Sequence, residues 1–267
     1  MKPKLIMRNL SSDLDKLKRF AVDNGFAGID WSFEMAALPT TPAEETRWVR
    51  SLAALDPLEI RYHCPFKQVD LGHENAAEVK AAVALFRRII RLIAKADGKY
   101  LTLHVGLGHD TTRILSWNST IDNLRQLVQF GAECGIKVCL ENLAWGWTSK
   151  PNLFEKLIRK TSAGVTFDIG HAYACEAVNS QYYAAEDFIT PHLDRVFNAH
   201  IYHTEIAGIG HMPPNRIEDI EQRLEILQAA GCLWWVIELT NVEGLLQTKK
   251  FIDAYLMASQ KVPSTAL

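Results

Sequence analysis

Short apolar runs alternate with amphipathic segments along almost the whole chain of 267 residues. The runs are rich in Val, Ile, Leu and aromatic residues, which is typical of strands buried on both faces. The longest amphipathic segment places Val79, Val83, Phe86, Ile90 and Ile93 at helical spacing. Parallel neighbours in a sheet need a crossover, and a helix after each strand supplies it. The alternation therefore predicts an α/β fold with a parallel sheet.

About eight strand–helix units fit into the chain, which matches the usual size of a (β/α)8 barrel. The expected strands are 4–8, 26–33, 59–66, 100–106, 137–143, 164–170, 195–203 and 234–240. The expected helices are 11–25, 41–55, 74–98, 116–134, 151–161, 180–190, 217–231 and 242–260. We expect a single TIM-barrel domain over 1–267, with 260–267 as a flexible tail. The alternative is an open, doubly wound sheet, but no GxGxxG motif follows the first expected strand.

Composition restricts the class of partner. Lys and Arg number 29 against 31 Asp and Glu, so the chain lacks the basic surplus of a protein that binds phosphate backbones, and nucleic acid is not an expected partner. No apolar run approaches the ~18 residues of a membrane span, and the N-terminus becomes charged too early for a signal peptide. The 5 cysteines are odd in number and have no CxxC spacing. They do not indicate a disulfide framework, so we expect a cytoplasmic protein.

Acids and histidines lie at the C-terminal tips of the expected strands. Glu141, Asp168, His200 and Glu238 end four consecutive runs. Strand C-termini meet at one face of a parallel barrel, so these side chains can converge despite their separation in sequence. Three carboxylates and one imidazole are a donor set suited to Mn²⁺, Mg²⁺, Co²⁺ or Zn²⁺. A single polar strand end often only meets solvent, but four in succession indicate a metal site.

A second set of candidates is richer in histidine and comprises His63, His104, His171 and His211. These residues are candidates for a second metal or for substrate contact, and each could instead be a histidine held by structural hydrogen bonds. Asp168 and His171 lie three apart, so they cannot share one face of a regular strand. They can converge if the chain turns after Ile169, and Gly170 permits such a turn.

Three further residues are candidates for substrate binding. Trp145 and Trp147 lie in a polar loop directly after Glu141, and aromatic planes stack well against the C–H faces of sugars. Packing beneath a loop is the alternative for both. His203, like its neighbour Glu205, lies just beyond the seventh expected strand, where it could contact substrate or orient the metal histidine.

Seven segments in one order make the chain resemble the xylose isomerase-like TIM barrel superfamily. They are HCP (63–65), HVG (104–106), ENLA (141–144), DIGHA (168–172), HIYH (200–203), GIGH (208–211) and the glutamate at 238. The superfamily includes sugar and sugar-phosphate isomerases and epimerases, and the type IV apurinic endonucleases. The resemblance covers nearly the whole chain but indicates no particular substrate.

The resemblance implies different chemistry for its two branches. In the epimerase branch, the residues that match Glu141, Asp168, His200 and Glu238 hold one divalent ion, often manganese, and the two glutamates act as acid and base. In the endonuclease branch, the residues that match the four histidines of the second set complete a three-zinc cluster with the same acids. The endonuclease pattern has aspartates where this chain has Ile209 and His203, which puts the third metal in doubt.

The favoured hypothesis is a divalent-metal-dependent isomerase or epimerase of a small sugar, a sugar phosphate or a related polyol-ketone. Glu141 and Glu238 would transfer a proton through a metal-stabilised enediolate. The alternatives are a metal-dependent phosphodiesterase of the apurinic endonuclease kind, and a dehydratase or lyase on the same barrel. A carbohydrate-binding protein without catalysis would not need so many ionisable strand ends. Related barrels are often dimers or tetramers, so a homo-oligomer is a further expectation.

Overall fold

Eight parallel strands form a closed barrel within residues 2–259, the part of the chain that the computed structural model describes. In chain order they are β1 (Lys4–Arg8), β2 (Gly28–Ser32), β3 (Glu59–Cys64), β4 (Tyr100–Leu103), β5 (Lys137–Glu141), β6 (Gly164–Asp168), β7 (Val196–Ile201) and β10 (Trp234–Ile237). The ring closes because β1 pairs in parallel with both β2 and β10. The expected (β/α)8 barrel is confirmed, and the open sheet is excluded. The predicted tail, 260–267, lies outside the described residues.

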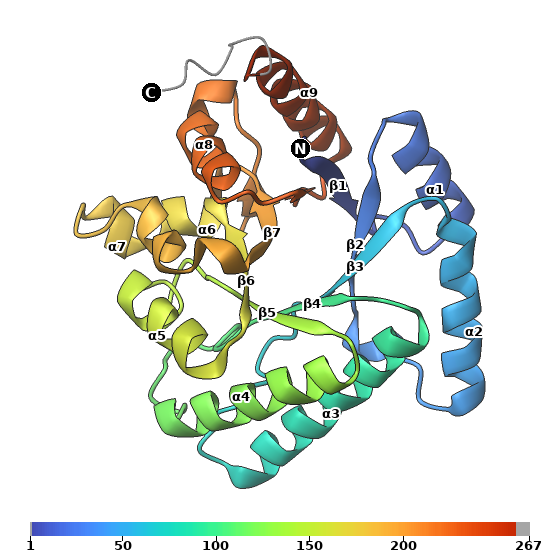
Figure 1. The fold of residues 1–267 in the computed structure, drawn as a ribbon, viewed down its shortest axis with the longest axis vertical. Helices are drawn as coiled ribbons and strands as arrows, with labels where there is room; N and C mark the ends of the chain where they lie inside the picture. The colour runs from blue at the N-terminus through green and yellow to red at the C-terminus, as the bar shows by residue number, and fades with distance from the viewer. Residues whose placement is uncertain (1, 260–267) are drawn as a thin grey trace.

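Helices surround the barrel on its outside (Figure 1). They are α1 (Leu14–Asp23), α2 (Pro42–Leu52), α3 (Ala76–Lys95), α4 (Trp117–Glu133), α5 (Pro151–Thr161), α6 (Ile169–Ala174), α7 (Glu176–Asn179), α8 (Glu221–Ala229) and α9 (Val242–Ser259). Short 3₁₀ turns are η1 (Met35–Ala37), η2 (Ala53–Leu55), η3 (Ala185–Phe188), η4 (Thr190–Arg195) and η5 (Ile217–Asp219). Within residues 2–259, every helix is too short or too polar to cross a lipid bilayer.

Most of the apolar core lies between the barrel and its helices. Outward-facing strand residues such as Ile29, Leu101 and Phe167 pack there against buried helix residues such as Leu17 and Ile90. This layer explains why the strands read as nearly continuous apolar runs, since only alternate residues face the barrel interior. All 5 cysteines are free, as expected from their number and spacing.

The barrel interior is filled by side chains in layers, as in other closed barrels of eight strands. An apolar cluster of Ile6, Trp234 and Val236 lies inside the ring. The hydroxyls of Thr102 and Thr166 lie 2.7 Å apart across it and form a polar layer. The predicted ligands Glu141, Asp168, His200 and Glu238 lie above this packed interior, at the carboxyl ends of the strands.

The segment after β6 differs from the predicted helix over 180–190. The chain instead enters α6 directly after β6, because the Asp168 carboxylate accepts a hydrogen bond of 2.7 Å from the His171 backbone N–H and caps the new helix. Short helical turns then occupy 176–195. The prediction for 180–190 was wrong because the sequence signal there was weak, and the expected strand 164–170 extended two residues past Asp168 into the start of α6.

A two-stranded antiparallel hairpin, β8 (Thr204–Ile206) and β9 (Gly210–Met212), follows β7 and was not predicted. Its register places Glu205 opposite His211. Gly208 and Gly210 have φ values of 78° and 103°, which side chains rarely adopt, so the two glycines allow the tight connection. The hairpin therefore folds a carboxylate back over a histidine at the barrel mouth.

The chain turns near Ile169 and brings His171 to Asp168, as predicted, but Gly170 serves close packing there and has no positive φ. A Cβ at this position would lie 2.1 Å from Cε2 of the buried Tyr202 ring. We expect Gly170→Ala to lower the free energy of unfolding by roughly 1–3 kcal/mol, as overpacking of cores does. Urea titration measures this, with exposed Glu176→Ala in the next helix as the control. A Gly170→Ala variant as stable as the unaltered protein would show that the contact with Tyr202 is not restrictive.

Candidate metal centre

Four of the predicted ligands form one buried group at the carboxyl end of the barrel. Glu141 ends β5, Asp168 ends β6, His200 lies near the end of β7 and Glu238 follows β10. These strands are consecutive around the ring, in the order β5, β6, β7, β10. One ligand atom from each residue lies within 4.8 Å of all the others, and all four side chains are buried. The structure thus brings together the four residues that the strand-end pattern selected.

His200 stands at the centre of this group. Its Nδ1 lies 3.1 Å from Glu141 Oε1, 3.0 Å from Glu238 Oε2 and 3.8 Å from Asp168 Oδ2. His200 Nδ1 and Asp168 Oδ2 nevertheless have no hydrogen-bond partner, although both are buried. Buried polar atoms are almost always paired, so buried atoms that converge without a partner among the described residues are suited to share a cation. The donor set of three carboxylates and one imidazole fits a divalent cation.

The charges of the group depend on one another. Burial alone would raise the pKa of Glu141, but His200 and His104 outweigh it and hold that pKa well below its usual range. The pKa of Glu238 is lowered in the same way, because the effect of His200 and His211 outweighs that of burial. Burial, reinforced by Glu141, raises the pKa of Asp168 to about 6. Both glutamates are therefore ionised at neutral pH.

His63 and His104 form a second group with the other oxygen of Glu141. The Nε2 atoms of the two histidines lie 3.4 Å and 3.1 Å from Glu141 Oε2, and 3.4 Å from each other. They come from β3 and from the residue after β4, and these strands continue the ring beyond β5. Glu141 thus offers Oε1 to one group and Oε2 to the next, which is the arrangement of a carboxylate that can bridge two ions.

His171 and His211 form a third group with Glu205 on the hairpin. His171 Nδ1 lies 2.9 Å from the Asn142 carbonyl oxygen, and His211 Nδ1 lies 2.9 Å from that of Glu238. A carbonyl oxygen can only accept, so each Nδ1 is the donor of its pair, and each Nε2 is the ring nitrogen left for other partners. Glu205 Oε2 is 3.2 Å from His171 Nε2. Two imidazoles and one carboxylate are a donor set typical of Zn²⁺.

The third group corrects one expectation from the sequence. Ile209, which stands where the resemblance implied an aspartate, is 72% exposed at the hairpin turn. The carboxylate comes instead from Glu205, four residues earlier, because the hairpin pairs it with His211. The third group therefore does not lack a carboxylate.

The three predicted substrate-binding residues lie in different surroundings. Trp145 is half-buried beside Gly106, in the loop two residues after His104. The Trp147 ring packs edge-on against Trp117 of α4, with 5.1 Å between the ring centroids. The structure therefore places Trp145 beside the loop that follows β4, and Trp147 within the packing of its own loop.

His203 points away from the three groups. Its Nδ1 lies 3.3 Å from the Asp219 carbonyl oxygen, and its ring lies against Tyr173, with 5.0 Å between the ring centroids. Arg223 donates hydrogen bonds to the carbonyl oxygens of His203 and Ile169, at 2.8 Å and 2.7 Å. The structure does not bring the His203 side chain to the other candidates, although its backbone helps to fix the end of β7.

The strand-end predictions did not include two further residues that lie at the centre. Asp30 lies near the end of β2, is 1% exposed and forms a group with His63 and His200. Asp30 follows an apolar run, as the other acids do. The strand continues with Trp31, however, so Asp30 does not look like a strand end in the sequence. Asn142 bonds its side chain to the Asp168 backbone N–H and carbonyl, each at 2.8 Å, and so joins the ends of β5 and β6.

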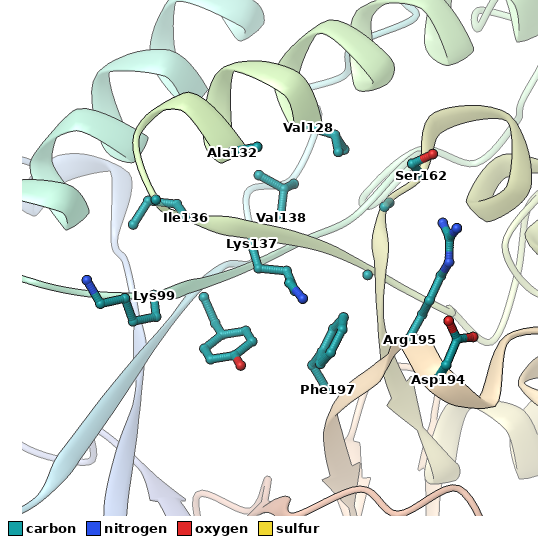
Figure 2. A pocket seen from close by; sticks show the side chains of 14 residues that line it. Lys99, Val128, Ala132, Ile136, Lys137, Val138, Ser162, Asp194, Arg195 and Phe197 are labelled. Atoms are coloured by element: carbon teal, nitrogen blue, oxygen red, sulfur yellow. The ribbon is translucent and has the colours of Figure 1, made fainter.

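A cavity of about 670 Å³, whose lining side chains are drawn in Figure 2, lies at the amino ends of the strands, opposite the candidate centre. Tyr100, Lys137 and Gly164, at the amino ends of β4, β5 and β6, line it. Active sites of such barrels lie at the carboxyl ends of the strands, and none of the residues of the three groups lines this cavity. The cavity is therefore separate from the candidate centre.

Comparison with known proteins gives matches over most of the chain. The family model described as xylose isomerase-like TIM barrel matches residues 19–255. An uncharacterized protein of Methanocaldococcus jannaschii, MJ0008, is 29% identical over 197 residues, which cover 74% of this chain and 80% of that protein.

Two solved structures illustrate the similarity in fold. A D-tagatose 3-epimerase-like protein has a TM-score of 0.72 at 19% identity, covering 97% of this chain and 98% of its own. Endonuclease IV from Thermus thermophilus has a TM-score of 0.66 at 16% identity, covering 96% of this chain and 100% of its own. At such identities these structures show a shared fold.

Proposed function

The chain belongs to the xylose isomerase-like TIM barrel family, and on this premise we propose that it is a divalent-metal-dependent isomerase or epimerase. Its substrate would be a small sugar, a sugar phosphate or a related polyol-ketone. Sugar epimerases among the structures of similar fold support this class of reaction.

One observation carries the proposal: two ionised glutamates flank a single imidazole in one buried ligand group. Glu141 ends β5 and Glu238 follows β10, and these two strands lie on either side of β6 and β7. Their carboxylate oxygens lie 3.1 Å and 3.0 Å from His200 Nδ1. A pKa below the usual range leaves each carboxylate deprotonated and able to accept a proton. Two such groups on either side of one centre suit the removal of a proton and its return to the opposite face.

A divalent ion held by Glu141, Asp168, His200 and Glu238 would polarise the substrate carbonyl and lower the energy of the carbanion beside it. One glutamate then accepts the proton from the C–H bond next to the carbonyl. The other glutamate takes up a proton from solvent and donates it, either to the opposite face of the same carbon or to the neighbouring carbon, and the first glutamate then returns its proton to solvent. Burial of both carboxylates excludes water, which strengthens their electrostatic effect on the reacting atoms.

Substrate would approach from the side of the hairpin. The side chains of Glu141 and His200 are 1% and 0% exposed, whereas those of His211 and Glu205 are 20% and 35% exposed. Exposure thus rises from the four-ligand group toward β8 and β9. We infer that the third group contacts the parts of the substrate that do not react.

The test is proton exchange with a panel of ketoses and ketose phosphates. Protein loaded with Mn²⁺, Co²⁺ or Zn²⁺ is incubated with each sugar in D₂O, the metal is removed, and the products are followed by NMR. The proposal expects an epimer or isomer that carries solvent deuterium at the altered carbon. Loss of water from the sugar would indicate a dehydratase instead. No exchange with any sugar under any metal would count against the proposal.

Phosphodiester hydrolysis is the second candidate, and a specific observation favours it. The three ligand groups adjoin one another, since Glu141 is shared by two of them and His171 Nδ1 lies 3.3 Å from Asp168 Oδ2. Clustered ions can activate water and hold a phosphate. Elemental analysis separates the two candidates. About one ion of Mn, Co or Mg per chain supports isomerisation, and two or three zinc ions support hydrolysis, which an oligonucleotide with an abasic site would then report.

A further inference from the structure

Asp30 is a buried carboxylate that the proposed proton transfer does not use. It lies near the end of β2, and its Oδ2 is 3.6 Å from His63 Nδ1 and 3.9 Å from His200 Nε2. Asp30 Oδ2, His63 Nδ1 and His200 Nε2 are all buried, and none has a hydrogen-bond partner. Three unpaired polar atoms around one point need a common explanation, because each would cost free energy if it stayed unpaired.

The opposite nitrogens of the same two rings face the metal groups. His63 Nε2 is 3.4 Å from Glu141 Oε2. His200 Nδ1 is within 3.1 Å of both Glu141 and Glu238. A neutral imidazole that gives the lone pair of one nitrogen to a metal keeps its proton on the other nitrogen. With ions bound, His63 Nδ1 and His200 Nε2 are therefore both donors.

Few acceptors are available to these two donors. For His200 Nε2, Asp30 Oδ2 is the one carboxylate oxygen within 4.0 Å among the described residues. His63 Nδ1 also lies 3.8 Å from Glu238 Oε1, but Glu238 is a ligand of the four-residue group and its Oε1 also lies 3.7 Å from Arg8 Nε. A small rotation of either ring would bring Asp30 within hydrogen-bonding distance.

We propose that Asp30 is a positioning residue that accepts a hydrogen bond from both His63 and His200. It would fix the tautomer and orientation of two imidazoles that serve different ligand groups, and so link the two metal positions through one carboxylate. A carboxylate behind a metal-binding histidine raises the basicity of the ligand, and loss of such a partner typically weakens metal binding by about 10–100-fold. This inference rests on the proposed metal-dependent function.

The test is Co²⁺ binding to Asp30→Asn, because the visible spectrum of bound Co²⁺ reports the geometry of its ligands. Asn keeps the size of Asp30 but removes its negative charge. We expect a dissociation constant about 10–100-fold higher, a shifted spectrum, the same number of ions per chain and unchanged thermal unfolding of the metal-free protein. Asp30→Glu should recover part of the affinity. Asp23→Asn, exposed at the end of α1, is the matched control and should bind as the unaltered protein does.

Other outcomes would overturn the inference. Equal affinity and an identical spectrum for Asp30→Asn would show that the carboxylate does not act on the ligand histidines. Loss of one ion per chain would show that Asp30 is itself a ligand. If the unaltered protein binds no metal, the proposed function fails first. If it binds metal and Asp30→Asn binds equally well, only the role of Asp30 is wrong.

Discussion

Glu141→Gln and Glu238→Gln are each expected to lower turnover at least about a thousandfold while the chain stays folded. Proton transfer by a positioned side chain contributes roughly 10²–10⁴-fold to a rate. A glutamine has nearly the same shape as a glutamate, but its amide cannot accept the proton. Each substitution also removes a charged ligand from the four-residue group. The measurement is kcat on the best substrate of the ketose panel, with metal at saturation.

The control for both variants is Glu133→Gln. Glu133 is exposed at the end of α4 and belongs to none of the ligand groups. It should keep full activity. Circular dichroism and thermal unfolding establish that all three variants are folded. Full activity in either Glu141→Gln or Glu238→Gln would contradict the proton-transfer mechanism, whatever the metal content.

Removal of metal is expected to abolish activity and to lower the Tm by roughly 5–10 °C. The carboxylates of Glu141, Asp168 and Glu238 lie together in a buried site, and a bound ion would compensate their repulsion. An ion present at 100 times its dissociation constant stabilises the folded state by about 2.7 kcal/mol. Each kcal/mol shifts the Tm of a protein of this size by about 2–4 °C.

Differential scanning calorimetry before and after chelation measures the change. Addition of Mn²⁺ or Co²⁺ should restore both the Tm and the activity. His200→Ala should show no such recovery, because it lacks the central ligand of the group. A metal-free protein with unchanged Tm and full activity would rule out a resident ion at this site.

The sequence predicted the barrel and the four-ligand group for a local reason. Several strands are continuous apolar runs with an ionisable residue at or next to their carboxyl end, and parallel strands collect these ends at one face. Glu141, Asp168 and His200 could therefore be placed together without any knowledge of contacts. His63 and His104 followed the same rule, and the structure places both against Glu141.

The rest of the site depends on packing between distant segments. Glu205 reaches His171 only because an unpredicted hairpin pairs it with His211. The hairpin consists of two strands of three residues on either side of a glycine-containing turn, and strands this short leave no clear alternation in the sequence. Asp30 was missed because its strand continues past it, so its place in the centre depends on the register of β2 against β3. Periodicity and turn residues do not report such registers.

Anomalous scattering from crystals of the metal-loaded protein tests the central claim most directly. With Mn²⁺ or Zn²⁺, we predict an anomalous peak within bonding distance of Glu141, Asp168, His200 and Glu238. A well-ordered, metal-loaded crystal with no peak among these four side chains, or with the ion bound elsewhere, would contradict it.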